Sequence, residues 1–196
     1  MRLSGPDAGA IAASITGDLP EPRIASQRSF TDTDGETIDS GLVLSFPAPN
    51  SFTGEDVVEL HGHGGPIVMA LIVDTAVARG ARLAEPGEFT KRAFLNDKLD
   101  LAQAEAIADL IDSGTEQAAR AALRSLAGEF SEHVSRVASE IERLRLYVEA
   151  AIDFPEEEID FLSDQQLLDA IETAEQSFAT LIAQTKVGRV LRDGYR

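Results

Sequence analysis

Glycine and proline are spread unevenly along this chain, and their distribution divides it near residue 98. Most of the 15 glycines and 8 prolines stand in residues 1–98, between short apolar runs. Residues 99–196 are instead rich in alanine, leucine, glutamate and glutamine. Turn residues between short runs are typical of mixed α/β structure, whereas a long stretch with few helix breakers favours helices. We therefore predict an α+β protein: a mixed α/β domain over residues 1–98, followed by a long-helix bundle domain over residues 99–196.

Apolar residues recur at helical spacing through the second half. They are separated by steps of three and four positions, a near-heptad stripe, at Leu123, Leu126, Phe130, Val134, Val137, Ile141, Leu144, Val148 and Ile152. We expect one continuous helix of roughly 38 residues, about 57 Å long. Ser113 and Glu116 have the spacing of a capping box for its start. A separate helix over Leu101–Ile111 precedes it.

A second long helix is expected after the acidic run Glu156–Glu158, which follows Pro155 and favours an interhelical loop over a metal site. Ser163 and Gln166 form another capping box. The apolar stripe behind it comprises Leu167, Leu168, Ile171, Ala174, Phe178, Leu181 and Ile182. Two such helices bury only one side of each other, so further helices, from this chain or elsewhere, should complete the bundle.

The first half alternates helices and strands. The predicted elements are a helix over Ala8–Ile15, strands over Gly41–Phe46 and Val57–His61, a helix from Pro66 to about Arg79 that ends at Gly80, and a strand over Ala81–Ala84. Gly62–Gly65 forms the turn before the second helix. Backbone N–H groups at such a helix start can hold an anionic or polar ligand.

Charge and composition limit the partners and the compartment. Lys and Arg total 17 against 34 Asp and Glu, a net charge of −17. A broad nucleic-acid surface needs the opposite sign, so any contact with nucleic acid should be local or made by another domain or partner. The chain has no cysteine, no apolar run of the length of about 18 residues that spans a membrane, and no apolar signal region at its N-terminus. We expect a cytoplasmic protein that does not enter the membrane.

The pair His61 and His63 is the first chemical candidate. Two histidines one residue apart at a strand end can supply two ligands to a catalytic metal, which would make the protein a free-standing metal-dependent hydrolase. Such a site needs further ligands, and the only other histidine, His133, stands in the other half. The structural alternative has His61 on the strand face and His63 hydrogen-bonded in the turn, and we favour it.

The glycines at 62, 64 and 65 are a weak signal on their own. They lack the Gly-x4-Gly-Lys-Ser/Thr pattern of a phosphate-binding loop, and the third glycine is misplaced for a dinucleotide fingerprint. The chain therefore shows no nucleotide triphosphate site. A tight turn with close backbone approach explains the glycines equally well.

Polar side chains next to apolar ones give two further candidates. Glu59 stands within an apolar strand, where its carboxylate can accept N–H groups of a heterocycle or simply face solvent. Arg92, Asn96 and Lys98 lie beside Phe89, Phe94 and Leu95. They indicate either a ligand site or a surface face with a helix cap.

Five segments in order resemble the tRNA modification GTPase family, MnmE (also called TrmE). They are Asn50–Asp56, Glu59–Pro66, Pro86–Asn96, Lys98–Ala106 and Tyr147–Pro155, and the likeness spans nearly the whole chain. The resemblance implies an N-terminal domain with the fold of folate-dependent aminomethyltransferases, which dimerises and binds a tetrahydrofolate derivative, either 5-formyl- or methylene-tetrahydrofolate. A helical domain follows, into which a Ras-like GTPase domain is inserted.

The resemblance also implies a function and partners. With a flavoprotein partner, the family modifies carbon 5 of the wobble uridine of certain tRNAs, and tRNA is bound mainly by the full complex. GTP, Mg²⁺ and K⁺ belong to the GTPase domain, which has no counterpart in these residues. The resemblance places a further strand before Arg2 and further domains after Arg196. We therefore expect a fragment that binds folate, forms a homodimer and carries no catalytic residue of its own.

The folate pocket is carried over by motif onto matching positions. Glu59 would suit the donors of the pterin ring, an arginine would suit the carboxylates of the glutamate tail, and the glycines would allow close backbone approach. The resemblance implies a pocket formed by Arg2, Glu59, His63, Gly64, Gly65 and Arg92.

Overall fold

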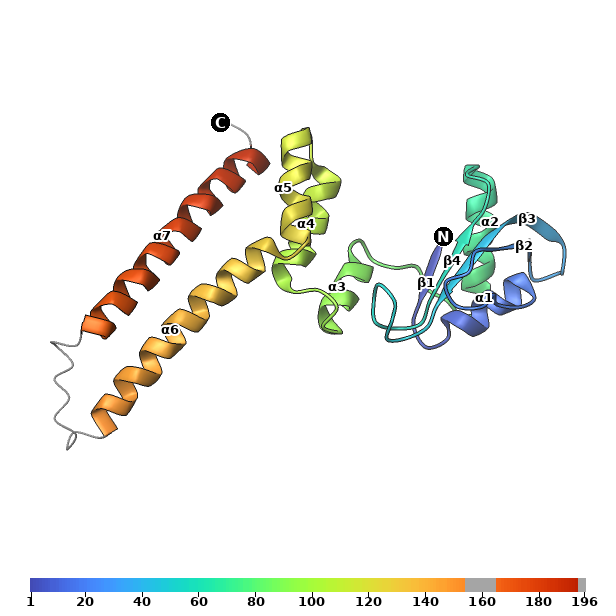
Figure 1. Cartoon of the computed structure of the whole chain (residues 1–196). Helices are drawn as coiled ribbons and strands as arrows, with labels where there is room; N and C mark the ends of the chain where they lie inside the picture. Colours follow the sequence, from blue (N-terminus) through green and yellow to red (C-terminus); the bar gives the residue numbers. More distant parts are fainter. Residues whose placement is uncertain (154–164, 194–196) are drawn as a thin grey trace. The chain divides into compact units, whose positions relative to one another are not determined.

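The computed structural model describes residues 1–153 and 165–193 and divides into two compact units, Met1–Leu99 and Asp100–Arg196 (Figure 1). The first unit combines a β-sheet with helices and the second is helical. This confirms the predicted α+β fold class. The units are described separately below.

The sheet of the first unit has four antiparallel strands in the order β1-β4-β3-β2. Their bounds are β1 Arg2–Ser4, β2 Ser26–Thr31, β3 Thr37–Phe46 and β4 Val57–His61. The predicted strand at 57–61 is confirmed, and the one at 41–46 is confirmed but begins earlier. The patterns missed β1, which has only three residues, and β2, whose sole apolar residue is Phe30.

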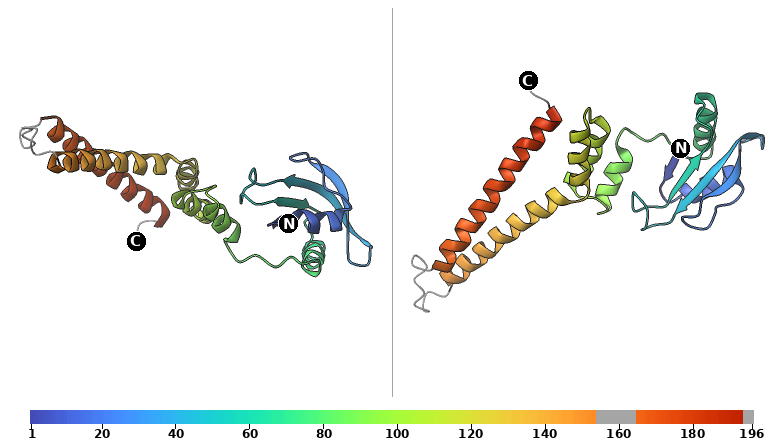
Figure 2. Two further views of the ribbon diagram at one scale, coloured as in Figure 1. Left: turned by 90° about the horizontal axis from the view of Figure 1, so that it is seen from below. Right: turned by 45° about the horizontal axis from the view of Figure 1, so that its top comes forward.

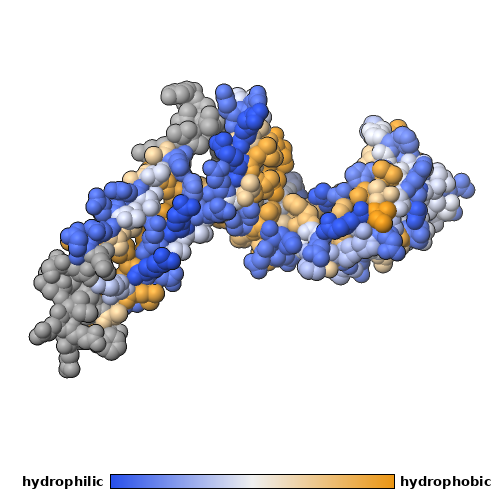
Figure 3. All heavy atoms as spheres, in the orientation of Figure 1, coloured by the Kyte–Doolittle hydropathy of each residue, from blue (hydrophilic) through white to orange (hydrophobic). Residues whose placement is uncertain are grey.

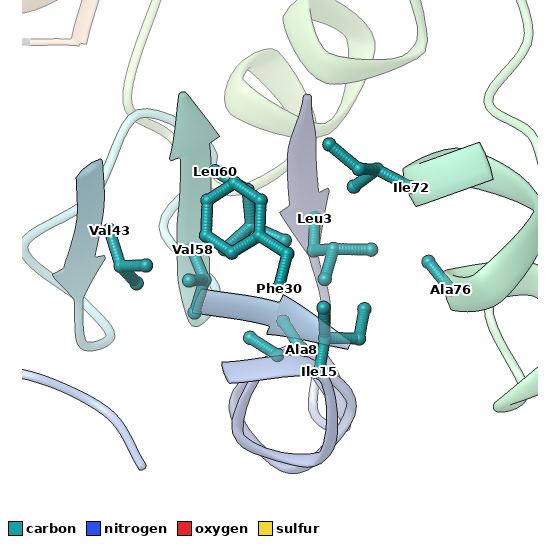
Figure 4. Packing of buried hydrophobic residues seen from close by; sticks show 10 residues of the cluster. Leu3, Ala8, Ile15, Phe30, Val43, Val58, Leu60, Ile72 and Ala76 are labelled. Atoms are coloured by element: carbon teal, nitrogen blue, oxygen red, sulfur yellow. The ribbon is translucent and has the colours of Figure 1, made fainter. Parts of the chain in front are cut away.

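Two helices, α1 (Ala8–Thr16) and α2 (Pro66–Ala78), pack on one face of this sheet, and both were predicted. The core between them is shown in Figure 4. It contains Leu3, Ala8, Ala12, Ile15, Phe30, Val43, Val58, Leu60, Ile72 and Ala76. Val58 and Leu60 of β4 point into this core. Because side chains alternate along a strand, Glu59 and His61 project from the other face of the sheet, away from α1 and α2.

The same alternation decides which side of β3 is buried. Leu42, Leu44 and Phe46 give this segment its apolar period, yet the residue that enters the core is Val43, which is fully buried. Leu42 remains 46% exposed and pairs with His61 on the face away from the helices. The apolar period therefore identified the strand but not its buried side.

The predicted strand over Ala81–Ala84 is wrong. These residues form no strand pairing, and the Ala81 N–H donates back to the Ala76 carbonyl at the end of α2. A short helix, α3 (Glu88–Leu95), follows instead, with Asn96 at its C-cap. A short segment makes a strand only where a neighbouring strand can pair with it, and here Leu83 is 69% exposed.

The second unit consists of α4 (Leu101–Asp112), α5 (Glu116–Leu126), α6 (Glu129–Asp153) and α7 (Gln165–Asp193). Asp100 and Gln103 form a capping box at the start of α4, and Gln103 Nε2 also donates to the Leu126 carbonyl at the end of α5. The views in Figure 2 show α6 and α7 as an antiparallel pair. His133 Nδ1 of α6 lies 3.0 Å from Gln184 Oε1 of α7, 51 positions further along.

The prediction of one continuous helix from about residue 116 to 153 is wrong. The helix breaks at Ala127 and Gly128, where Gly128 adopts a left-handed φ of 95°. The apolar stripe continues across the break, since Leu123 and Leu126 end α5 and Phe130 begins α6. The apolar period alone therefore gave no sign of the turn between α5 and α6. A single glycine, which adopts positive φ without steric cost, was the signal for it.

The predicted capping box at Ser113 is also wrong by two positions. Thr115 is the N-cap of α5, and its hydroxyl accepts the Ala118 N–H at 3.1 Å. Ser113 instead ends α4 and donates to the Leu110 carbonyl. The predicted interhelical loop with Glu156–Glu158 and the capping box of Ser163 with Gln166 lie outside the described residues.

Apolar side chains gather on the visible surface of α4 and α5 and again between α6 and α7 (Figure 3). Ile141, Leu144 and Val148 of α6 face Leu167 and Ile171 of α7 across an apolar groove. Among the helices that the structure describes, none combines the length and the hydropathy that a membrane span requires.

Candidate functional site

Arg2 and Glu59 are neighbours in the sheet. They are register partners on β1 and β4. The Arg2 guanidinium donates to Glu59 Oε1 from Nε at 2.8 Å, and its Nη2 lies 2.6 Å from the same oxygen. Two sequence-predicted residues separated by 57 positions are thus brought into direct contact.

Two aromatic rings flank the Arg2 guanidinium. Its Cζ lies 5.4 Å from the ring centroid of Phe52, in the loop before β4, and 5.6 Å from that of Phe89 on α3. Both distances are within cation–π range. Arg2, Glu59, Phe52 and Phe89 therefore form one cluster, here called the Arg2 cluster, in which a charged pair stands beside flat apolar surfaces.

His61 contacts the other oxygen of Glu59. Its Nε2 lies 3.0 Å from Glu59 Oε2. Partial burial raises the pKa of the Glu59 carboxyl, but hydrogen bonds from Arg2 and His61 outweigh this effect, so the pKa lies below its usual range. Glu59 is therefore an ionised acceptor at neutral pH.

Arg92 lies in a separate network on α3. Its Nη1 donates to Glu55 Oε2 at 2.8 Å, and its Nη2 donates to Glu88 Oε1 at 2.8 Å. Glu88 also accepts from Arg82. Hydrogen bonds raise the pKa of Arg92, with the largest contribution from Glu55 and the next from Glu88. The pKa of Glu88 is lowered, mainly by its hydrogen bond from Arg82.

This network reaches β1 through Ser4. The Ser4 hydroxyl donates to Glu55 Oε2 at 2.9 Å. Ser4 Oγ also lies 2.7 Å from Thr53 Oγ1, and because Ser4 has one hydroxyl proton, Thr53 is the donor of that bond. Thr53 is fully buried. Arg92 is thereby linked to the strand that carries Arg2.

Asn96 and Lys98 also tie α3 to the loop before β4. Asn96 Nδ2 donates to the Thr53 carbonyl at 2.7 Å, and Lys98 Nζ donates to the Pro49 carbonyl at 3.0 Å. A Cβ on Gly54, whose φ is 78°, would meet Asn96 Cβ at 3.1 Å. The polar residues of this segment therefore hold Phe52 and Phe89 in one place.

His63 is fixed at the far end of β4 by Asp39. The His63 backbone N–H donates to Asp39 Oδ2 at 2.8 Å, and ring Nδ1 lies 2.8 Å from Oδ1. These bonds from His63 lower the pKa of Asp39. Close approach explains two glycines here. A Cβ on Gly41 would lie 2.0 Å from the His61 carbonyl oxygen, and one on Gly62 would lie 2.5 Å from Asp39 Oδ2.

At Gly64 and Gly65, by contrast, no close contact within the protein requires glycine. An added Cβ would meet nothing within 4 Å at Gly64, and only Val68 at 4.0 Å at Gly65. Gly65 is the N-cap of α2 and Pro66 occupies the first turn, as predicted. This side of the turn is open.

The geometry does not assemble a metal site from His61 and His63. The two rings meet different carboxylates, Glu59 for His61 and Asp39 for His63. No group of three potential metal ligands occurs among residues 1–153 and 165–193. The two histidines instead occupy the strand face and the turn that the structural alternative assigned to them.

A pocket of about 300 Å³ lies along the outer side of β1. Arg2 and Arg92 line it, together with Phe89 and Glu88, whereas Glu59, His63, Gly64 and Gly65 do not. The six sequence-predicted residues thus fall into three neighbourhoods: Arg2 with Glu59, Arg92 with α3, and the His63 turn. The patterns did not assign roles to Phe52, Phe89, Glu55 and Asp39, although the first three lie in the segments that carry the resemblance.

Comparison with known proteins adds the family. The profile of the GTP-binding protein TrmE N-terminus matches residues 1–98, and that of the MnmE helical domain matches residues 101–196. The tRNA modification GTPase MnmE of Pseudomonas syringae pv. tomato is 55% identical over 194 residues. The proteins of the same name from Stutzerimonas stutzeri and Pseudomonas paraeruginosa are 56% and 57% identical.

These alignments cover 99% of this chain but only 42–43% of the relatives. The chain therefore spans less than half the length of the curated relatives it matches. Since two adjoining profiles account for nearly every residue, the chain belongs to the MnmE (TrmE) family of tRNA modification GTPases.

Proposed function

We propose that Met1–Leu99 is a domain that binds a tetrahydrofolate derivative and dimerises, in a protein that modifies carbon 5 of the wobble uridine of certain tRNAs with a flavoprotein partner. The observation that carries the folate proposal is the Arg2 cluster. Asp100–Arg196 would be the first part of the helical domain. The absence of cysteine from the sequence fits a reducing, cytoplasmic setting.

The chemistry of the Arg2 cluster suits a folate. Ionised Glu59 can accept an N–H group of a pterin, because Oε2 keeps a lone pair beyond the one used by His61. Phe52 and Phe89 offer flat faces, and the guanidinium groups of Arg2 and Arg92 suit the carboxylates of a glutamate tail. When bound, the folate would supply a one-carbon group, and these residues would hold and orient it.

The turn at Gly62–Gly65 supports the same site. Gly64 and Gly65 have open space where a side chain would stand, so their backbone is accessible to a ligand. His63, held by Asp39, fixes the turn on its other side. We place the folate beside this turn, between it and the Arg2 cluster.

Calorimetry with 5-formyl-tetrahydrofolate tests the proposal. Glu59→Ala should weaken binding by about 1–3 kcal/mol, because the ligand donors lose a charged acceptor. Leu144→Ala is the control, since Leu144 lies in the groove between α6 and α7. It should lower stability and leave the affinity of the folded fraction unchanged. Equal affinity of Glu59→Ala and parent would make Glu59 a solvent-facing strand residue, and a parent that does not bind would refute the folate proposal.

The dimer contact is best placed on the sheet face opposite α1 and α2. The only charged side chains that the strands direct to this face are Arg2 and Glu59, which neutralise each other, within an acidic chain. Leu42 is 46% exposed there, beside Leu44 and Phe46. A face with balanced charge and exposed apolar groups suits a second copy, which carries the same net charge elsewhere.

Sedimentation velocity at micromolar concentration measures this. The parent should sediment as a species of at least twice 21.0 kDa. Leu42→Asp should shift it towards the monomer, whereas Ile111→Asp, which changes an even more exposed apolar residue of the helical unit, serves as the matched control. A monomeric parent would refute dimerisation, and a dimeric Leu42→Asp would move the contact elsewhere.

GTP binding would reside in the part of the relatives that this chain does not span. The relatives are named GTPases, and no phosphate-binding loop occurs in these 196 residues. Mg²⁺ and K⁺ would accompany GTP there. Any contact of this acidic chain with tRNA would be made through the full complex.

The rival function, a metal-dependent hydrolase, has a simple test. Elemental analysis of the purified protein should find zinc well below one equivalent. Stoichiometric zinc that is lost in His61→Gln would favour the rival over the folate proposal.

A further inference from the structure

Glu59 is held at both of its carboxylate oxygens by side chains from two strands. Oε1 accepts from Arg2 of β1, with Nε at 2.8 Å, and Oε2 lies 3.0 Å from His61 Nε2. Rotation of the carboxylate about its terminal bond would break one of these contacts. The two partners together therefore set the plane of the group, which neither could do alone.

Strand geometry places His61 for this task. Residues two apart on a strand share one face, so the His61 ring stands beside Glu59. On β3 the register partners are Leu42 for His61 and Leu44 for Glu59, and neither carries a charge. From β1, the charged groups near Glu59 are the Arg2 guanidinium and the α-amino group of Met1. Asp39 and His63 pair with each other at the turn.

The hydrogen-bond roles follow from the charge on Glu59. Its pKa lies below the usual range, so the carboxylate only accepts at neutral pH. His61 must then donate from Nε2, and its ring, which is 54% exposed, keeps Nδ1 for solvent. The remaining lone pair of Oε2 lies in the plane that this bond fixes.

We propose that His61 is a positioning residue of the ligand site: with Arg2 it orients the Glu59 carboxylate so that Oε2 can accept an N–H group on the edge of a flat heterocycle. This inference rests on the proposed folate site and adds to it a residue whose role is to orient Glu59. This role requires a hydrogen-bond donor to Glu59 at position 61, but it does not require an aromatic ring.

Three substitutions separate donation from packing. His61→Leu removes the donor, His61→Gln keeps a longer amide that can reach Oε2, and His61→Asn carries an amide too short to do so. We expect binding of 5-formyl-tetrahydrofolate to weaken roughly tenfold in His61→Leu and His61→Asn and to stay within about threefold of the parent in His61→Gln. His133→Leu, which removes a histidine from α6, is the control and should bind as the parent does.

Calorimetry gives the affinities, and thermal denaturation followed by circular dichroism confirms that each variant is folded. Parent-like affinity in His61→Leu overturns the inference, while the folate site stands. Equal weakening in His61→Gln and His61→Leu also overturns it, because the ring rather than the donor would then matter. If the parent does not bind, the proposed function fails and the inference with it.

Discussion

Arg92 Nη1 donates a hydrogen bond to Glu55 Oε2 across 2.8 Å, although 37 positions separate the two residues in the sequence. This contact joins α3 to the loop that precedes β4. Ser4 donates to the same Glu55 oxygen, so one carboxylate connects the loop, the helix and the edge strand. The arrangement around Arg2 depends on this junction, because Phe52 and Phe89 belong to the two segments that it holds together.

Replacement of Arg92 by methionine should lower stability by about 1–2 kcal/mol, because Glu55 and Glu88 would lose a shared donor in a partly buried setting. Urea denaturation measures the change. Arg82→Met is the matched control: Arg82 also donates to Glu88, but its side chain is 65% exposed, so its loss should be smaller. A larger effect for Arg82→Met would show that Glu88, and not the link to Glu55, organises α3.

Asp39 should make the stability of the first unit sensitive to acid. Its pKa is lowered by hydrogen bonds from His63, so the ionised form stabilises the fold, and this stabilisation is lost as pH falls through the lowered pKa. Unfolding free energy measured by urea at several values between about pH 5 and pH 3 should fall less steeply in Asp39→Asn than in the parent. His63→Ala should flatten the same profile, and the double variant should add little. Additive effects would contradict a direct Asp39–His63 coupling.

Gly128 should tolerate no side chain without a stability penalty. With a φ of 95°, alanine there would be strained by about 1–2 kcal/mol. Gly114, before α5, has no positive φ and no atom within 4 Å of an added Cβ, so Gly114→Ala is the control and should be nearly neutral. Melting temperatures by circular dichroism compare the two. If Gly128→Ala were as stable as the parent, α5 and α6 would join as one helix, as the apolar stripe alone predicts.

This chain should not bind GTP. No Gly-x4-Gly-Lys-Ser/Thr loop is present to hold the phosphates. Titration of a fluorescent GTP analogue with Mg²⁺ present should give no saturable signal, and binding at micromolar concentration would contradict the proposal that GTP belongs to the rest of the relatives' length.

The sequence predicted helices better than strands for a physical reason. Helices carry their own period and hydrogen bonds, so α1, α2 and α4 followed from local patterns. A strand also depends on what pairs with it. Ser26–Thr31 forms β2 with one apolar residue because β3 lies beside it, whereas Ala81–Ala84 has three apolar residues and no strand pairs with it.

The candidate site was predictable residue by residue but not as an arrangement. Arg2 and Glu59 were both singled out, yet only strand register reveals that they face each other. Phe52 stands near Arg2 because Asn96 and Lys98 hold its loop to α3. Such contacts join segments tens of residues apart, and no local spacing encodes them. The resemblance identified the residues, but their grouping in space depends on tertiary packing.

Position 41 of the first unit has no room for a side chain. It lies in the middle of β3, where glycine ordinarily weakens a strand, but its missing side chain is the space that the His61 carbonyl fills. One added methyl group would push that carbonyl away and shift the backbone that carries both His61 and the turn after it. A saturation mutagenesis screen should therefore find position 41 among the least permissive of the sheet, although it bears no chemistry of its own.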